Sequence, residues 1–197
     1  PEMNKGSIPV DGGNLLLSDE EYKILVDENP DIVKYIRPFL GAEEFLHNVN
    51  RWCLWLIGVS PNEINGISSI KKRVEAVKAF RLDSTKEATR KYADFPARFM
   101  ELRQPTSSYL LFPSHSSESR RYVPIGFLSP NVICGNANLI IPSATLYHFG
   151  ILTSNVHMAW MRAVCGRLKS DYRYSKDVVY NNFPWPSIDD KNKDIIR

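Results

Sequence analysis

Residues 154–186 read SNVHMAWMRAVCGRLKSDYRYSKDVVYNNFPWP, and this stretch decides the interpretation of the rest of the chain. In its first half, apolar residues recur at intervals of three and four positions, at Val156, Ala159, Trp160, Ala163 and Val164. This spacing predicts an amphipathic helix whose apolar stripe faces a core. Gly166 follows directly and is expected to end the helix, because glycine readily adopts the left-handed conformation that closes many helices.

Basic residues alternate with acidic and aromatic ones after this glycine, at Arg167, Lys169, Asp171, Tyr172, Arg173, Tyr174 and Lys176. Arginine and lysine bond phosphates or guanine, aspartate accepts from the cytosine amino group, and tyrosine stacks or bonds phosphate. The mixture therefore indicates contact with nucleic acid. The alternative is a solvated helix end, whose cations lie near the negative pole of the helix dipole. The residue types alone leave both interpretations open.

Composition limits what the whole chain can be. Its 197 residues, 43% of them hydrophobic, suffice for one globular core with at most a small satellite lobe. The formal charge is only +3, so any functional basic surface must be local. Three widely spaced cysteines with apolar neighbours suggest reduced thiols and a cytoplasmic protein without membrane association. A start at proline and a charged end suggest a piece of a longer protein.

The remaining patterns predict an α+β fold with a mixed, largely antiparallel sheet packed with helices. Apolar runs bounded by turn residues predict strands over residues 51–57, 109–113, 122–128, 131–134 and 138–141. The last two should form a hairpin around the Gly135-Asn136 turn.

Three segments divide the chain by composition. Residues 1–30 suggest a linker with a short helix that Ser18 caps, residues 31–187 a single domain, and residues 188–197 a connector or tail.

A long helix is expected over residues 61–84, with an isoleucine and valine stripe and basic residues on its other faces. Lys71, Lys72 and Lys78 are candidates for contacts to DNA phosphates, since counterion release rewards such contacts. The alternatives are an ordinary solvated face or a surface that binds another protein.

The quoted segments carry a family resemblance. IRPFLGAEEFLHNVNRWCLWL, VKAFRLDS and PSHSSESRRYVPIGFL precede the stretch that opens at Leu146 and ends at Pro186, all in a fixed order. Together they resemble the target recognition domain of MmeI-like restriction-modification enzymes, over about residues 36–186.

These bacterial enzymes fuse a nuclease, an adenine-N6 DNA methyltransferase and a DNA-reading domain. The resemblance implies that this chain recognises specific sequences in double-stranded DNA, through the major groove. It also implies that S-adenosylmethionine and Mg²⁺ bind to parts of a parent enzyme absent here, and that this chain has no catalytic or metal-binding residues.

The resemblance also implies roles for particular residues. In the pattern Gly-Arg-Leu-x-Ser-x-Tyr-Arg-Tyr-Ser, the positions of Lys169 and Asp171 vary together and read one base pair, and the position of Arg173 acts at a neighbouring one. The alternative is that Lys169 and Asp171 form only an exposed ion pair. Contacts to the DNA backbone, or from the loop over residues 114–121, are expected from Ser116, Ser117, Arg120, Arg121, Arg167, Tyr172 and Lys176.

Two other function classes stay open as alternatives. Asn182-Phe183-Pro184-Trp185 is similar to the Asn-Pro-Pro-aromatic motif of adenine methyltransferases, but phenylalanine occupies a proline position. Asp189 and Lys191 have the spacing of a metal-nuclease pair without an evident acidic partner, so a charged tail explains them better. The chain could also be a protein-interaction module that uses the lysine helix.

Overall fold

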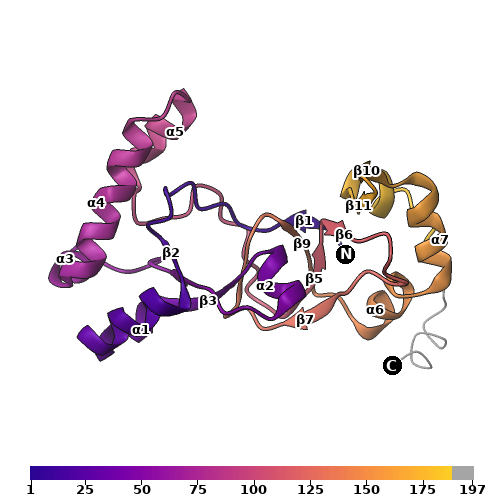
Figure 1. Ribbon diagram of the computed structural model, residues 1–197, viewed down its shortest axis with the longest axis horizontal. Helices are drawn as coiled ribbons and strands as arrows, with labels where there is room; N and C mark the ends of the chain where they lie inside the picture. The colour runs from indigo at the N-terminus through magenta and orange to yellow at the C-terminus, as the bar shows by residue number, and fades with distance from the viewer. Residues whose placement is uncertain (188–197) are drawn as a thin grey trace. The chain divides into compact units, whose positions relative to one another are not determined.

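The computed structural model describes residues 1–187, and Figure 1 shows their helices and strands. The expectations for residues 188–197, including Asp189 and Lys191, lie outside the described residues. The chain forms two compact units. Unit 1 consists of Pro1–Gly6, Arg103–Pro130 and the chain from Asn136 onward, and unit 2 consists of Ser7–Leu102 and Asn131–Gly135. Within the described part, no helix is long and apolar enough to span a membrane.

Unit 1 contains an antiparallel sheet with strand order β1-β9-β5-β7. The strands are β1 (Asn4–Lys5), β9 (Asn138–Pro142), β5 (Tyr109–Pro113) and β7 (Gly126–Leu128). All five residues of β5 are buried, which explains why its sequence is a continuous apolar run instead of an alternating one. The predicted strand over residues 109–113 is confirmed, and the largely antiparallel α+β fold is confirmed with it.

Helices α6 (Leu146–Leu152) and α7 (Asn155–Val164) complete the core of unit 1, with a single π-helical turn at Lys176–Tyr180. The predicted apolar stripe of α7 is confirmed at Trp160 and Val164, which pack against the core, and is wrong at Val156, Ala159 and Ala163, which are exposed. The buried residues are His157, Met158 and Met161, whereas Val156 is 70% exposed. The long methionine side chains fill the core beside Tyr172 and Tyr174, which turns the smaller apolar residues toward solvent.

His157 is the buried polar residue of this helix. Its Nε2 shares a hydrogen bond of 3.0 Å with the Tyr174 hydroxyl, and its ring meets Phe183 edge-on at 4.6 Å. Burial lowers the pKa of His157 to about 4, because the charged imidazolium would lose its hydration there. Burial also raises the pKa of Tyr174, so both groups are neutral at physiological pH.

We expect His157 to make the chain less stable in mild acid. An unfolded histidine titrates near pH 6.5, above the folded pKa of about 4, so the unfolded state takes up a proton first as the pH falls. This histidine should therefore remove about 1–2 kcal/mol of stability between pH 6.5 and about pH 5. Urea titrations at both pH values check this, and His157→Gln should flatten the pH dependence. The same substitution at exposed His47 should not, and equal slopes in all three proteins would contradict the assignment.

Unit 2 contains a second sheet, with strand order β2-β4-β3-β8. The strands are β2 (Leu16–Leu17), β4 (Trp52–Leu54), β3 (Ile36–Leu40) and β8 (Ile133–Cys134). The expected hairpin around Gly135-Asn136 is wrong, because β8 pairs in parallel with β3 whereas β9 pairs with β5 and β1. The segment Gly135–Asn136 instead carries the chain from one unit to the other.

Unit 2 contains five α-helices within the described residues. They are α1 (Asp19–Glu28), α2 (Ala42–His47), α3 (Pro61–Gly66), α4 (Ser68–Leu82) and α5 (Glu87–Lys91), with 3₁₀ turns at Pro30–Tyr35 and Tyr92–Asp94. Of these helices, α1 and α3 begin at a capping box. Ser18 and Glu21 form the capping box expected before α1. The predicted single helix over residues 61–84 is divided, because Ile67 adopts an extended conformation after Gly66. Residues 1–30 contain β1 and β2 as well as the expected helix.

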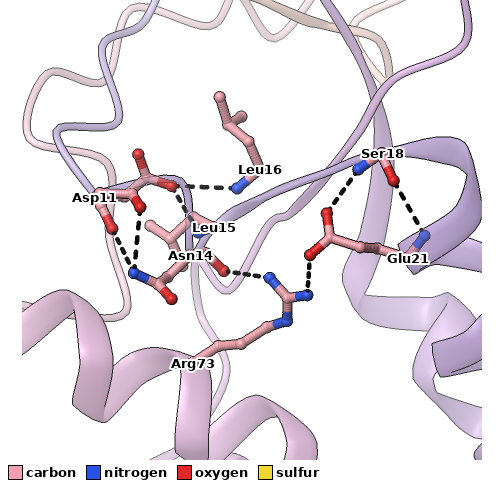
Figure 2. Close-up of polar contacts among 8 residues, drawn as sticks. Asp11, Asn14, Leu15, Leu16, Ser18, Glu21 and Arg73 are labelled. Atoms are coloured by element: carbon pink, nitrogen blue, oxygen red, sulfur yellow. Dashed lines mark hydrogen bonds and ion pairs between the residues drawn. The ribbon is translucent and has the colours of Figure 1, made fainter.

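A polar network joins α4 to the segment before α1, and Figure 2 shows it. Arg73 donates to the Asn14 carbonyl at 3.2 Å and to the Glu21 carboxylate at 2.6 Å. Partial burial raises the pKa of Glu21, but the bond from Arg73 and one from the Ser18 backbone outweigh it and hold that pKa below its ordinary value. The Asp11 carboxylate accepts from the backbone amide of Leu15 at 2.6 Å. Arg73 is therefore a structural residue, not part of a solvated basic face.

Candidate nucleic-acid interface

The segment after α7 is a β-hairpin, not the end of a helix. The helix ends at Val164, and Gly166 begins strand β10 (Gly166–Leu168), which pairs antiparallel with β11 (Asp171–Arg173). Lys169 and Ser170 form the two-residue connection. Lys169 has a φ of +55°, a left-handed conformation that non-glycine residues seldom adopt and that short hairpin turns require. The interpretation of these cations as the solvated end of a helix is therefore wrong.

The alternating geometry of β11 separates its side chains into two groups. Tyr172 is 6% exposed and packs into the core of unit 1. Asp171 and Arg173, one position before and after it, are exposed on the opposite face. Strand β6 (His115–Ser116) pairs with β11 on its other side, so Ser116 lies opposite Tyr172 and is also buried. The side chains of Tyr172 and Ser116 therefore face the core of unit 1 and are absent from the exposed face of the sheet.

Arg167 holds the hairpin in shape. Its guanidinium lies 3.9 Å from the centroid of the Tyr172 ring, and Nη1 donates to the Ser170 carbonyl at 2.6 Å. The same nitrogen lies 3.5 Å from the Glu118 carboxylate. These contacts tie the turn, the strand beneath it and the neighbouring loop together. Arg167 was expected to contact the DNA backbone, and the structure gives it these internal partners.

Lys169 and Asp171 lie at the tip of the hairpin. The Asp171 carboxylate accepts a hydrogen bond of 3.2 Å from the backbone amide of Glu118, which fixes its position. Within residues 1–187, no ion pair joins Lys169 to Asp171 or to any other carboxylate. The alternative in which Lys169 and Asp171 form only an exposed ion pair is therefore wrong. The tip presents an ammonium donor and a carboxylate acceptor to solvent.

The loop that follows β6 is partly ordered by its own residues. The hydroxyls of Ser117 and Ser119 lie 2.9 Å apart, and the Arg121 guanidinium lies 5.2 Å from the Tyr122 ring. Arg162 on α7 donates to the Arg121 carbonyl at 2.8 Å. Arg120 is half-buried and Arg121 is exposed.

Alanine at both Arg120 and Arg121 is expected to weaken binding to duplex DNA by roughly tenfold at moderate salt, if each contacts one phosphate. The slope of log affinity against log salt concentration should fall in magnitude by about 2. Titrations at several salt concentrations measure both quantities. An unchanged affinity and slope would assign the loop a structural role only.

The predicted lysines Lys71, Lys72 and Lys78 lie on α4 and are exposed. Lys71 makes a loose ion pair of 3.9 Å with Glu75 one turn away. These lysines belong to unit 2, whereas the hairpin belongs to unit 1.

Comparison with known proteins identifies the family. Residues 1–187 match the family described as MmeI, target recognition domain. The chain belongs to this family. Its fold matches a solved structure of the Type IIL restriction-modification enzyme MmeI in complex with DNA, with a TM-score of 0.94 and 45% sequence identity. The match covers 98% of this chain and 26% of that one. DNA methyltransferase A of Bacillus subtilis (strain 168) is 38% identical over the whole chain, which spans 22% of that relative.

The aromatic residues near the end of this target recognition domain serve packing. Phe183 is buried against His157, and its ring meets Trp185 edge-on at 5.4 Å. The Trp160 indole donates to the Val179 carbonyl at 2.9 Å, which anchors the π-helical turn to α7. The similarity of Asn182–Trp185 to a methyltransferase motif is therefore explained by packing.

Cysteines and other metal ligands do not gather in the described part of the domain. Among residues 1–187, no group of three histidine, cysteine, aspartate or glutamate side chains could hold a metal ion. Cys53 and Cys134 are buried cysteines that form no disulfide, and burial raises the pKa of the Cys53 thiol so that it stays protonated.

Two residues of unit 1 escaped the sequence interpretation. Lys5 and His115 line a groove beside Arg173, together with Lys176. Lys5 is a single lysine in a two-residue strand near the start of the chain. No local pattern marks it, since only the pairing of β1 with β9 brings it to this place.

Proposed function

We propose that this target recognition domain reads a specific sequence in the major groove of double-stranded DNA through the β10–β11 hairpin. The observation that carries the proposal is the tip itself, where Lys169 and Asp171 are exposed on a braced turn without pairing to each other. A two-stranded ribbon fits the major groove, and a rigid support lets a few side chains select bases. The choice of partner is supported by the solved structure of MmeI, which is a complex with DNA.

The chemistry of the pair fits one G·C base pair. An ammonium donates to guanine O6 and N7, and a carboxylate can accept from N4 of the paired cytosine. An A·T pair would set an amino donor against Lys169 and an O4 acceptor against Asp171. Each good contact discriminates by about 1–3 kcal/mol. Arg173 is proposed to act at a neighbouring base pair, since it lies on the same face of β11 as Asp171.

We further propose that the domain is the specificity module of a larger bacterial enzyme, an adenine-N6 DNA methyltransferase with a type II endonuclease activity. The names of the two relatives support this, and the domain corresponds to 22% and 26% of their lengths. Methylation needs S-adenosylmethionine and cleavage needs Mg²⁺, and both would bind to other parts of that enzyme. The domain by itself would position the duplex and would not catalyse either reaction.

A titration of the intact protein against duplex DNA at two salt concentrations tests the proposed function. We expect tighter binding to DNA that contains the recognised sequence, and weaker binding to all DNA at the higher salt. Turnover by this domain alone would favour intrinsic chemistry instead. Binding to another protein that added DNA does not change would favour a protein-interaction module.

The lysines of α4 are proposed to contact phosphates only. Changing Lys71, Lys72 and Lys78 to glutamine should weaken binding to specific and unrelated duplexes by about the same factor, because phosphate contacts carry no sequence information. Parallel titrations with the two kinds of duplex measure this ratio. A changed sequence preference in the triple variant would contradict the assignment.

A further inference from the structure

A basic groove of about 510 Å³ lies in unit 1 beside the exposed end of β11. Four side chains that can donate hydrogen bonds from nitrogen line it, namely those of Lys5, His115, Arg173 and Lys176. They come from four separate elements, namely β1, β6, β11 and the π-helical turn. The fold, rather than any local motif, therefore assembles this cluster.

Strand pairing explains how the groove forms. Lys5 lies opposite Leu139 in the β1–β9 pair, and His115 lies opposite Arg173 in the β6–β11 pair. Gly166 is the partner of Arg173 on the other side of β11. Directly paired residues project to the same face of a sheet, so the missing side chain of Gly166 leaves Arg173 uncovered there.

The lysines of the groove lack the carboxylate partners that Lys23 and Lys91 have within the described residues. Lys23 and Lys91 each lie 2.7 Å from a carboxylate one helical turn away. Within residues 1–187, neither Lys5 nor Lys176 forms an ion pair, although Asp177 also lines the groove. Lys5, Arg173 and Lys176 therefore share the groove with one carboxylate, and an anion placed between these basic groups would reduce their mutual repulsion.

We propose that this groove binds a backbone phosphate of the same DNA duplex that the hairpin reads. The proposal rests on the proposed function, and it adds Lys5 and His115 to the interface. Lysine and imidazole groups donate hydrogen bonds to phosphate oxygens without regard to sequence. Arg173 connects the groove to the tip, because Asp171 lies two residues along the same exposed face. A phosphate held in the groove would thus add affinity for the duplex beside the tip without selecting among bases.

The test is the double variant Lys5→Gln with Lys176→Gln in the intact protein, measured by duplex titrations over a range of salt concentrations. We expect affinity to fall roughly tenfold at low salt, and the salt slope to shrink in magnitude by about 1, since the contact with one phosphate is lost. Preference for the recognised sequence over unrelated DNA should stay the same. Lys5→Arg with Lys176→Arg keeps both charges and should retain the slope.

The matched control is Lys23→Gln with Lys91→Gln, which removes the same amount of charge from exposed lysines that already have carboxylate partners. An equal loss of slope in the control would show that net charge alone matters, and would overturn the groove. A changed sequence preference in the groove variant would overturn the phosphate assignment. If the unaltered protein bound no duplex at all, the proposed function would fail and the groove with it, whereas an unchanged slope in the groove variant alone would reject only the groove.

Discussion

Replacing Arg81 with methionine is expected to lower the free energy of unfolding of unit 2 by about 3 kcal/mol. Arg81 on α4 is fully buried, with an exposed fraction of 0%. Its guanidinium makes five hydrogen bonds of 2.7–3.3 Å, all to backbone carbonyls, of Pro9, Val10, Tyr92, Phe95 and Arg98. One side chain thereby ties α4 to two separate loops.

The size of the expected effect follows from what methionine leaves behind. Methionine approximates the length of the arginine stem. It also avoids the cost of burying a charge, the same cost that lowers the pKa of Arg81 in the native protein. It offers no donor, so five partly buried carbonyls lose a hydrogen bond at once, although those of Pro9, Tyr92 and Phe95 still accept from backbone amides. Bonds from a charged donor are stronger than neutral ones, and unsatisfied buried acceptors are costly. Lysine at this position should be intermediate, because an ammonium has at most three donors and no planar fork.

Hydrogen exchange of the unit 2 amides, or chemical denaturation, would measure the loss. The matched control is Arg90→Met on α5. Arg90 is exposed and donates one hydrogen bond of 2.7 Å, to the Ser84 carbonyl. Its replacement should cost less than about 1 kcal/mol. Equal losses in the two variants would show that the buried fork has no special role.

The sequence predicts those elements that depend on neighbouring residues. The apolar run from Tyr109 to Pro113 is a strand with the predicted bounds, because a buried central strand needs apolar residues at every position. The capping box of Ser18 and Glu21 is also local, and α1 begins where it predicts.

Elements that depend on distant partners were not predictable in the same way. Strand β8 has two residues, and its parallel pairing with β3 joins segments that lie far apart in the chain. That pairing goes with the assignment of Asn131–Gly135 to unit 2, although the chain on either side of this segment belongs to unit 1. Arg81 shows the same limitation, because its spacing in the sequence is that of a solvated basic residue. Only the loops around α4 reveal that it is buried.

The candidate interface shows what the resemblance supplied and what it lacked. Lys169 and Asp171 came from the family pattern, and the hairpin geometry explains how they can act together. The sequence did not show that Tyr172 packs into the core whereas Asp171 and Arg173 face solvent. The two faces of residues 171–173 become distinct only when the segment is known to be a strand. No sequence pattern marks Lys5 as a residue of the candidate interface.

Exchanging the charges at the tip is expected to change one position of the recognised sequence. In Lys169→Glu with Asp171→Arg, a carboxylate would face the former guanine position and a guanidinium its partner. A carboxylate accepts from cytosine N4 and a guanidinium donates to guanine O6 and N7, so C·G should replace G·C at that position. With about 1–3 kcal/mol for each good contact, the preference should reverse by at least roughly tenfold. Mapping the modified sites in the intact enzyme would measure the change.

The geometry of the tip determines which control makes this test decisive. Asp171 accepts from the Glu118 amide at 3.2 Å, so arginine at this position also removes a bond that holds the neighbouring loop. Asp171→Asn can keep that bond through its amide oxygen while it loses the carboxylate charge, so it should relax discrimination at one position without moving the loop. If the charge-exchanged enzyme stays active and still modifies the original sites, Lys169 and Asp171 do not read bases. If the charge-exchanged enzyme is inactive whereas the asparagine variant keeps both activity and discrimination, Asp171 acts through the loop, and its proposed contact with cytosine is wrong.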